Sequence, residues 1–116
     1  MCTFNKNVAL MFGIKEAIIA QFIWSSIYEK EGEQTQYRMV HNDVIWCRCS
    51  MLVMTSYFPF YSRHQIGDAI NSLIDSNIIR KSRFNISAFD KTNWYTFTEY
   101  GKRIMTDEGD ANEKGL

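Results

Sequence analysis

The stretch of sequence that decides the fold is "FPFYSRHQIGDAINSLIDSNIIRKSRF", residues 58–84. It opens with a turn around Pro59, and Ser62 followed three residues later by Gln65 is the capping-box pattern that starts a helix. Apolar residues then recur at helical spacing to about residue 76, where Asn77 suits a left-handed helix end. A basic strand comes next, so this stretch predicts a capped helix followed directly by a β-strand.

The residues before this stretch add an apolar helix, a hairpin and a short helix. Residues 13–31, "GIKEAIIAQFIWSSIYEKE", are apolar on most sides, and we predict one helix that Gly32 ends. Two β-rich runs within residues 36–49 are separated by "HND", which predicts a hairpin with a tight turn. We expect a short helix over residues 51–58, capped by Ser50.

The residues after it supply a returning strand and an acidic end. "WYTFT", residues 94–98, predicts an antiparallel partner for the basic strand, and "EYGKRIMTDE" predicts one or two helical turns. The order predicts an α+β winged helix-turn-helix, with a three-helix core, a β-hairpin after the first helix and a β-wing after the third. We assign this domain to residues 1–105 and a mobile acidic tail to residues 106–116.

Charge and cysteine content narrow the classes of function. The chain has 116 residues, with 13 basic and 13 acidic side chains, but residues 60–105 carry seven basic against four acidic ones. Three cysteines, without a disulfide framework or an export signal, favour reduced thiols and a cytoplasmic location, and no apolar run is long enough to cross a membrane. No glycine-rich phosphate loop or nucleophile–base pattern is present, so we predict a non-enzyme without a cofactor.

Several motifs resemble those of one family. They are "GIKEAIIAQFIWSSI", the "FPF" turn, the "LIDSNII" helix exit and "KTNWYT" in the returning strand. Together they resemble the N-terminal winged-helix domain of phage replisome-organiser proteins and related replication initiators, over roughly residues 8–100. The resemblance implies binding of origin DNA, self-association and a part in phage or mobile-element replication. We predict a role in replication or transcription control.

The candidate DNA-binding residues come from the capped helix and the basic strand and loop. The amino-terminal residues of a recognition helix read base edges in the major groove, and wing cations contact phosphates. This assignment selects Ser62, Arg63, His64, Gln65, Asn71, Arg80, Lys81, Arg83 and Lys91. Asp68 and Asp75 share the outward face of the helix and oppose it, because carboxylates repel phosphates.

Other interpretations stay open beside double-stranded DNA binding. The acidic outward face and zero net charge also fit a small phage protein that uses the same scaffold to bind and inhibit a host protein complex, in the manner of an anti-CRISPR. The apolar first helix favours a homodimer, unless the rest of the domain covers it. Cys47, Cys49 and His41 form a weak metal pattern that buried thiols explain better. The aromatics around Pro59 fit core packing better than base stacking.

Overall fold

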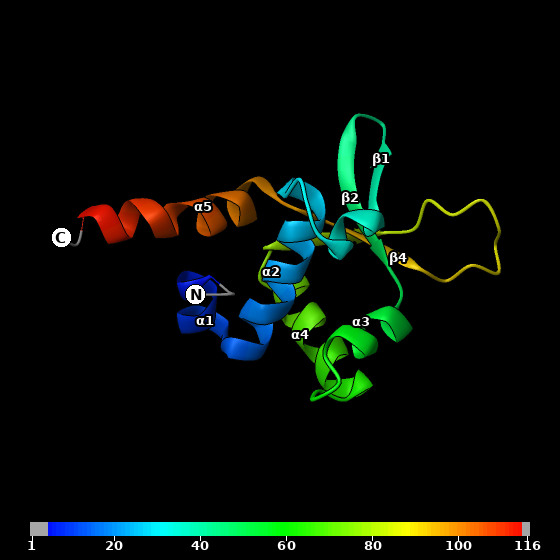
Figure 1. The fold of residues 1–116 in the computed structure, drawn as a ribbon, viewed down its shortest axis with the longest axis horizontal. Helices are drawn as coiled ribbons and strands as arrows, with labels where there is room; N and C mark the ends of the chain where they lie inside the picture. Colours follow the sequence, from blue (N-terminus) through cyan, green and yellow to red (C-terminus); the bar gives the residue numbers. More distant parts are fainter. Residues whose placement is uncertain (1–4, 115–116) are drawn as a thin grey trace.

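The computed structural model describes the backbone of residues 5–114 and the side chains of residues 5–106. These residues form an α+β fold with five α-helices and a four-stranded antiparallel sheet (Figure 1). The helical elements are α1 (Lys6–Phe12), α2 (Ile14–Tyr28), the 3-10 helix η1 (Glu33–Tyr37), α3 (Met51–Tyr57), α4 (Arg63–Asp75) and α5 (Glu99–Lys114). The strands are β1 (Arg38–His41), β2 (Val44–Cys49), β3 (Ile79–Ser82) and β4 (Asn93–Phe97).

The local signals read from the sequence are confirmed. Ser62 and Gln65 form the capping box in both directions, with Oγ of Ser62 accepting from the Gln65 N–H at 3.1 Å. Asn42 and Asp43 both take positive φ, as the tight turn between β1 and β2 requires. Asn77 has φ 62° after α4, which is the left-handed conformation predicted for it.

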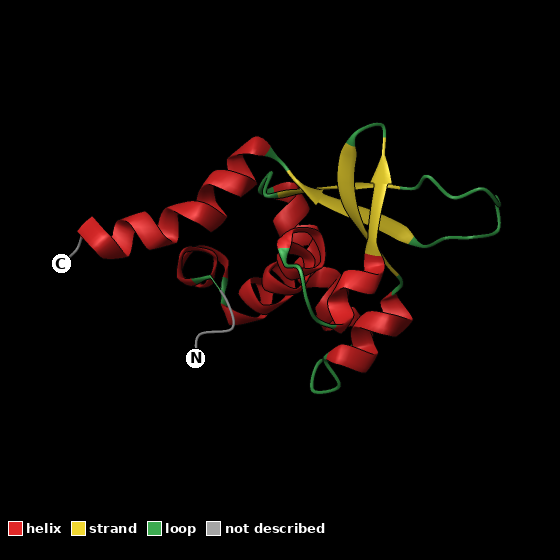
Figure 2. Cartoon of the chain, turned by 45° about the horizontal axis from the view of Figure 1, so that its top comes forward, coloured by secondary structure: helices red, strands yellow, loops and turns green. Residues whose placement is uncertain are grey.

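The sheet joins the two hairpins that the sequence predicts separately. Its strand order is β1-β2-β4-β3, and β2 pairs with β4 so that Cys47 lies opposite Tyr95. On the other side of β4, Lys81 of β3 also lies opposite Tyr95. One face of the sheet packs on α2 and α4, and the loop between β3 and β4 extends away from the helices (Figure 2).

The first predicted helix differs from the observed one at both ends. Gly13 has φ 115°, a conformation that separates α1 from α2, so a further helix precedes the predicted one. The helix then ends at Tyr28 because Glu29 is extended, and Gly32, the predicted stop, instead precedes η1. Glycine suits both junctions because it has no Cβ to oppose a positive φ.

Helix α2 is the centre of the core rather than an external surface. Its buried residues are Ala17, Ile19, Ala20, Phe22, Ile23, Ser26 and Ile27. They pack against α1, α4 and the strands β2 and β4. The apolar surface that favours a homodimer in the sequence is therefore largely covered within the chain, and the homodimer stays a prediction without this support.

Helices α1 and α5 pack together at the end of the molecule opposite the β3–β4 loop (Figure 1). Buried Asn5 caps α1 through the Val8 N–H and also donates from Nδ2 to the Met105 carbonyl at 2.9 Å. Gly101 lies against the Ile78 carbonyl. Helix α5 continues to Lys114, where the sequence predicts only one or two turns and then a tail. The mobility of residues 106–116 stays a prediction, and residues 115–116 lie outside the described residues.

Candidate nucleic-acid interface

The first turn of α4 presents four of the nominated residues to solvent. Ser62, Arg63, His64 and Gln65 are all exposed. The capping box uses the Ser62 hydroxyl, and the Gln65 side-chain carbonyl accepts from the Ser62 N–H at 2.8 Å. These two groups are therefore engaged with the helix backbone. Arg63 has no salt-bridge partner among the described residues, so its five donors are available to a ligand.

The outward face of α4 is polar, and its central carboxylate, Asp68, lies beside the His64 imidazole. Nε2 of His64 lies 3.2 Å from Oδ2 of Asp68, one turn further along the helix. A protonated His64 would offset the charge that Asp68 presents on this face. Asn71 is exposed one turn beyond Asp68, and Asp75 is exposed in the last turn. The amino-terminal end of α4 is therefore the part of the helix best suited to an anionic ligand.

The four nominated cations after α4 do not lie on one surface. Arg80 projects from the face of the sheet away from the core, with its guanidinium 5.4 Å from the centre of the Trp46 ring. Lys81 is exposed on the opposite face of β3. Arg83 donates from Nε to Oδ1 of Asn93 at 2.8 Å, and Lys91 is exposed on the loop. The sequence assigns Arg80 to the same phosphate-binding set as Lys81, Arg83 and Lys91. In the structure Arg80 lies on the opposite face of the sheet from Lys81.

Three cations from distant parts of the sequence meet in one groove of about 400 Å³. Arg63 comes from the start of α4, and Arg83 and Lys91 come from the loop between β3 and β4. The other lining residues are Ser50, Met51, Leu52, Thr92, Asn93 and Tyr95. None of these described lining residues is a carboxylate. Guanidinium and ammonium groups in such an arrangement bind phosphate oxygens through charge-assisted hydrogen bonds.

The sequence does not identify the neutral residues of this groove. Asn93 and Tyr95 lie two apart on β4, so they share a face, and Asn93 donates from Nδ2 to the Tyr95 hydroxyl oxygen at 3.2 Å. Burial raises the pKa of Tyr95, so the phenol stays neutral. Strand alternation in the sequence predicts that Asn93 and Tyr95 share a face. It does not predict that this face lies beside the start of α3, so the sequence alone does not place the pair in the groove.

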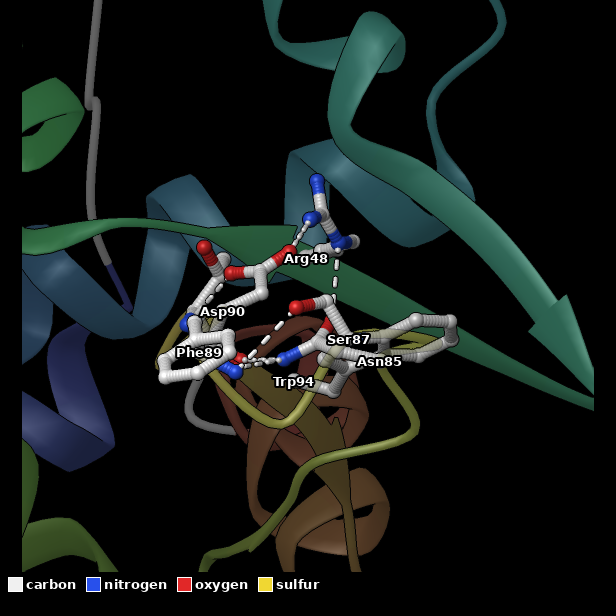
Figure 3. A network of polar contacts seen from close by, with 7 residues as sticks. Arg48, Asn85, Ser87, Phe89, Asp90 and Trp94 are labelled. Atoms are coloured by element: carbon white, nitrogen blue, oxygen red, sulfur yellow. Dashed lines mark hydrogen bonds and ion pairs between the residues drawn. The ribbon is translucent and has the colours of Figure 1, made fainter.

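A hydrogen-bond network gives the β3–β4 loop its shape (Figure 3). The Asn85 side chain uses all four of its hydrogen-bonding positions. Its Nδ2 donates to the carbonyls of Asp90 and Thr92, and its Oδ1 accepts from Arg48 Nε at 3.2 Å and Trp94 Nε1 at 2.8 Å. Arg48 also pairs with Asp90. The loop is therefore fixed to β2 and β4 by side chains, none of which the sequence singles out for this role.

Asp90 does not weaken the cationic character of the loop as a free carboxylate would. It accepts hydrogen bonds from Thr92 N–H at 3.0 Å and from Arg48. The bonds from Thr92, followed by the Arg48 guanidinium, lower the pKa of Asp90. The carboxylate is thus ionised and paired, and Arg83 and Lys91 supply the remaining charge of this surface.

The weak metal pattern separates in the structure. Cys47 and Cys49 are buried in the core, and burial raises the pKa of Cys47 to about 12 and raises that of Cys49 as well. His41 stacks on Phe84 at 3.8 Å on the opposite face of the sheet. Within the described residues no three His, Cys, Asp or Glu side chains are grouped as metal ligands.

The aromatics before α4 mainly close the core, as the sequence favours. Phe58 is buried and packs edge-on against Phe22 of α2, with Tyr57 beside it. Phe60 is the exception, because it is exposed at the rim of an apolar groove beside α2.

Of the helices in the described part of the chain, none is long and apolar enough to cross a membrane.

Comparison with protein-family models, with curated proteins and with solved structures finds no match to this chain.

Proposed function

We propose that this chain is a winged helix-turn-helix protein that binds double-stranded DNA without catalysis. Helix α4 would lie in the major groove, and the β3–β4 loop would act as the wing on the adjacent backbone. The resemblance to replisome organisers favours a role in replication or transcription control of a phage or mobile element. The observation that carries the proposal is the groove in which Arg63, Arg83 and Lys91 converge, with no carboxylate among its described lining residues.

The arrangement of elements supports this reading. Helices α3 and α4 are joined by a short turn and α4 is followed by the β3–β4 hairpin, which is the order of a winged helix-turn-helix. Strand β2, which lies between α2 and α3 in the sequence, pairs with β4. This pairing fixes the β3–β4 hairpin beside α4. Arg63 at the amino terminus of α4 can then reach a base edge while Arg83 and Lys91 contact phosphates of the same duplex.

Fluorescence anisotropy with a labelled duplex at low salt tests the proposal. We expect binding in the micromolar range or tighter, with an affinity that falls steeply as salt rises. Arg63→Ala should weaken binding by about 1–3 kcal/mol and relax specificity at one base pair. Lys91→Ala should weaken all sequences alike and reduce the salt slope by about 0.9.

Arg103→Ala is the matched control for Arg63→Ala. It removes the same charge from an exposed position on α5, at the end of the molecule away from the groove. If Arg103→Ala weakens binding as much as Arg63→Ala, the interaction depends on net charge and not on this interface. Absence of binding to any duplex at low salt would refute the proposal.

A second function, binding of a host protein without DNA, is favoured by a different surface. An apolar groove of about 560 Å³ lies between α2 and the turn before α4, with Ile18, Phe22 and exposed Phe60 among its lining residues. Aromatic side chains at such grooves are frequent anchors of protein–protein contacts. Host-lysate pull-downs with and without nuclease separate the two functions, because only a protein partner survives nuclease treatment.

A further inference from the structure

The β3–β4 loop, whose ends line the cationic groove, exposes two apolar side chains at its tip. Ile86 is fully exposed and Phe89 is 93% exposed. A single exposed apolar residue has no special meaning, but two at one loop tip form a feature that needs explanation. Both lie between Arg83 and Lys91 in the sequence, and these two cations line the groove that Arg63 also lines. The apolar tip is thus carried by the loop whose two ends supply Arg83 and Lys91 to that groove.

The network around Asn85 holds this tip in place. Asn85 binds the carbonyls of Asp90 and Thr92, and the Phe89 N–H donates to Oγ of Ser87 at 3.2 Å (Figure 3). The polar side chains of the loop bond to its own backbone and to Arg48 of β2 and Trp94 of β4. Ile86 and Phe89 therefore remain outside without a contact that would cover them, and the ordered loop spares a ligand the entropy of arranging them.

The charged residues of the loop indicate which kind of ligand its apolar tip contacts. Arg83 and Lys91 stand at its base, and Asp90, its one carboxylate, is paired with Arg48. Apolar side chains flanked by cations are the pattern of proteins that insert a wedge between base pairs from the minor groove while cations hold the phosphates. A purely apolar pocket on a protein partner would supply no negative charge to these two cations.

We propose that Ile86 and Phe89 form a wedge that enters the minor groove, partly unstacks one base step and bends the duplex. This inference rests on the proposed DNA binding and adds a deformation that cations alone would not produce. Unstacking a base step costs free energy, and the bend offsets this cost by bringing more phosphates to the protein surface. Specificity would then include a preference for flexible pyrimidine–purine steps at the site of the wedge.

The test compares the unaltered chain with a variant carrying both Ile86→Ser and Phe89→Ser on one labelled duplex. A duplex of about 30 base pairs carries a donor and an acceptor at its ends, so that bending raises energy transfer, and 2-aminopurine at a central step reports unstacking. We expect both signals to change with the unaltered chain and to be lost in the variant. Affinity should fall on the order of tenfold, and the salt slope should become shallower, because an unbent duplex brings fewer phosphates to the cations.

Leu10→Ser is the control, since it removes an equally exposed apolar side chain from α1, at the opposite end of the molecule. It should leave both signals unchanged. Binding by the unaltered chain without bending or unstacking, or equal bending by the variant, would overturn the wedge and leave the DNA-binding proposal intact. Unchanged duplex binding by the variant, together with loss of a partner captured from host lysate, would assign the tip to a protein. No duplex binding at all would refute the underlying function instead.

Discussion

Two glycines in helices predict opposite effects of the same substitution. Gly67 lies within α4, and a Cβ built on it meets nothing within 4 Å. Gly101 lies in the first turn of α5, and a Cβ there would stand 1.9 Å from the Ile78 carbonyl oxygen. Alanine has the higher helix propensity, so both substitutions should stabilise the protein if propensity alone mattered.

The expected magnitudes follow from these distances. For Gly67→Ala we expect a gain of about 0.5–1 kcal/mol in the free energy of unfolding. For Gly101→Ala, ordinary contact begins at 3.4 Å, so α5 must move away from the Ile78 carbonyl by about 1.5 Å. Overpacking of this kind costs about 1–3 kcal/mol, and a retreat of α5 would also strain the bond from Asn5 to the Met105 carbonyl. The net effect of Gly101→Ala should be a loss of about 1–2 kcal/mol.

Chemical and thermal unfolding of the two variants measure this difference directly. Since about 1 kcal/mol corresponds to a shift of roughly 4–8 °C in a domain of this size, the two melting temperatures should move apart by several degrees in opposite directions. Gly67→Ala serves as the control for helix propensity. Equal stabilisation by both substitutions would show that α5 does not dock against the Ile78 carbonyl.

Three further predictions concern other parts of the molecule. Asn5→Ala should lower the free energy of unfolding by about 2 kcal/mol, since it removes a helix cap and leaves a carbonyl of α5 unpaired, and urea denaturation measures the loss. Asn85→Ala should speed hydrogen exchange at the Asp90 amide by NMR while the core amides of α2 keep their protection, and equal protection in the loop would contradict the network. Cys47 and Cys49 should resist iodoacetamide at about pH 8 in the folded protein and react once urea unfolds it, as peptide mass spectrometry can follow. Because these raised thiol pKa values keep protons on the folded protein, their contribution to stability is complete below about pH 9 and falls as pH rises above it.

The parts of the fold that depend on neighbouring residues could be predicted from the sequence. The Ser62–Gln65 capping box, the turn at Asn42 and Asp43, and the left-handed Asn77 are determined by chemistry within a few residues. Such signals need no knowledge of distant contacts, so they survive in a single sequence.

The remaining features depend on contacts between distant residues. The pairing of β2 with β4 is set by packing on α2, and without it the sequence cannot show that Arg63 and Lys91 share a groove. The pairing of β3 with β4 decides which face of the sheet carries Arg80, because a strand exposes alternate residues on opposite sides. Helix α1 could have been found from the capping residue Asn5 and the break at Gly13, but its seven residues carry too little periodicity to assign alone.

The double role of Asn5 has a practical consequence for experiments. By linking the first helix to the last, it holds both ends of the described chain at one end of the molecule, while the β3–β4 loop lies at the other (Figure 1). A dye, an affinity handle or a surface linker joined to either end would therefore lie far from the β3–β4 loop. Single-molecule recordings of bending could use such attachments and still leave the loop free to engage its target.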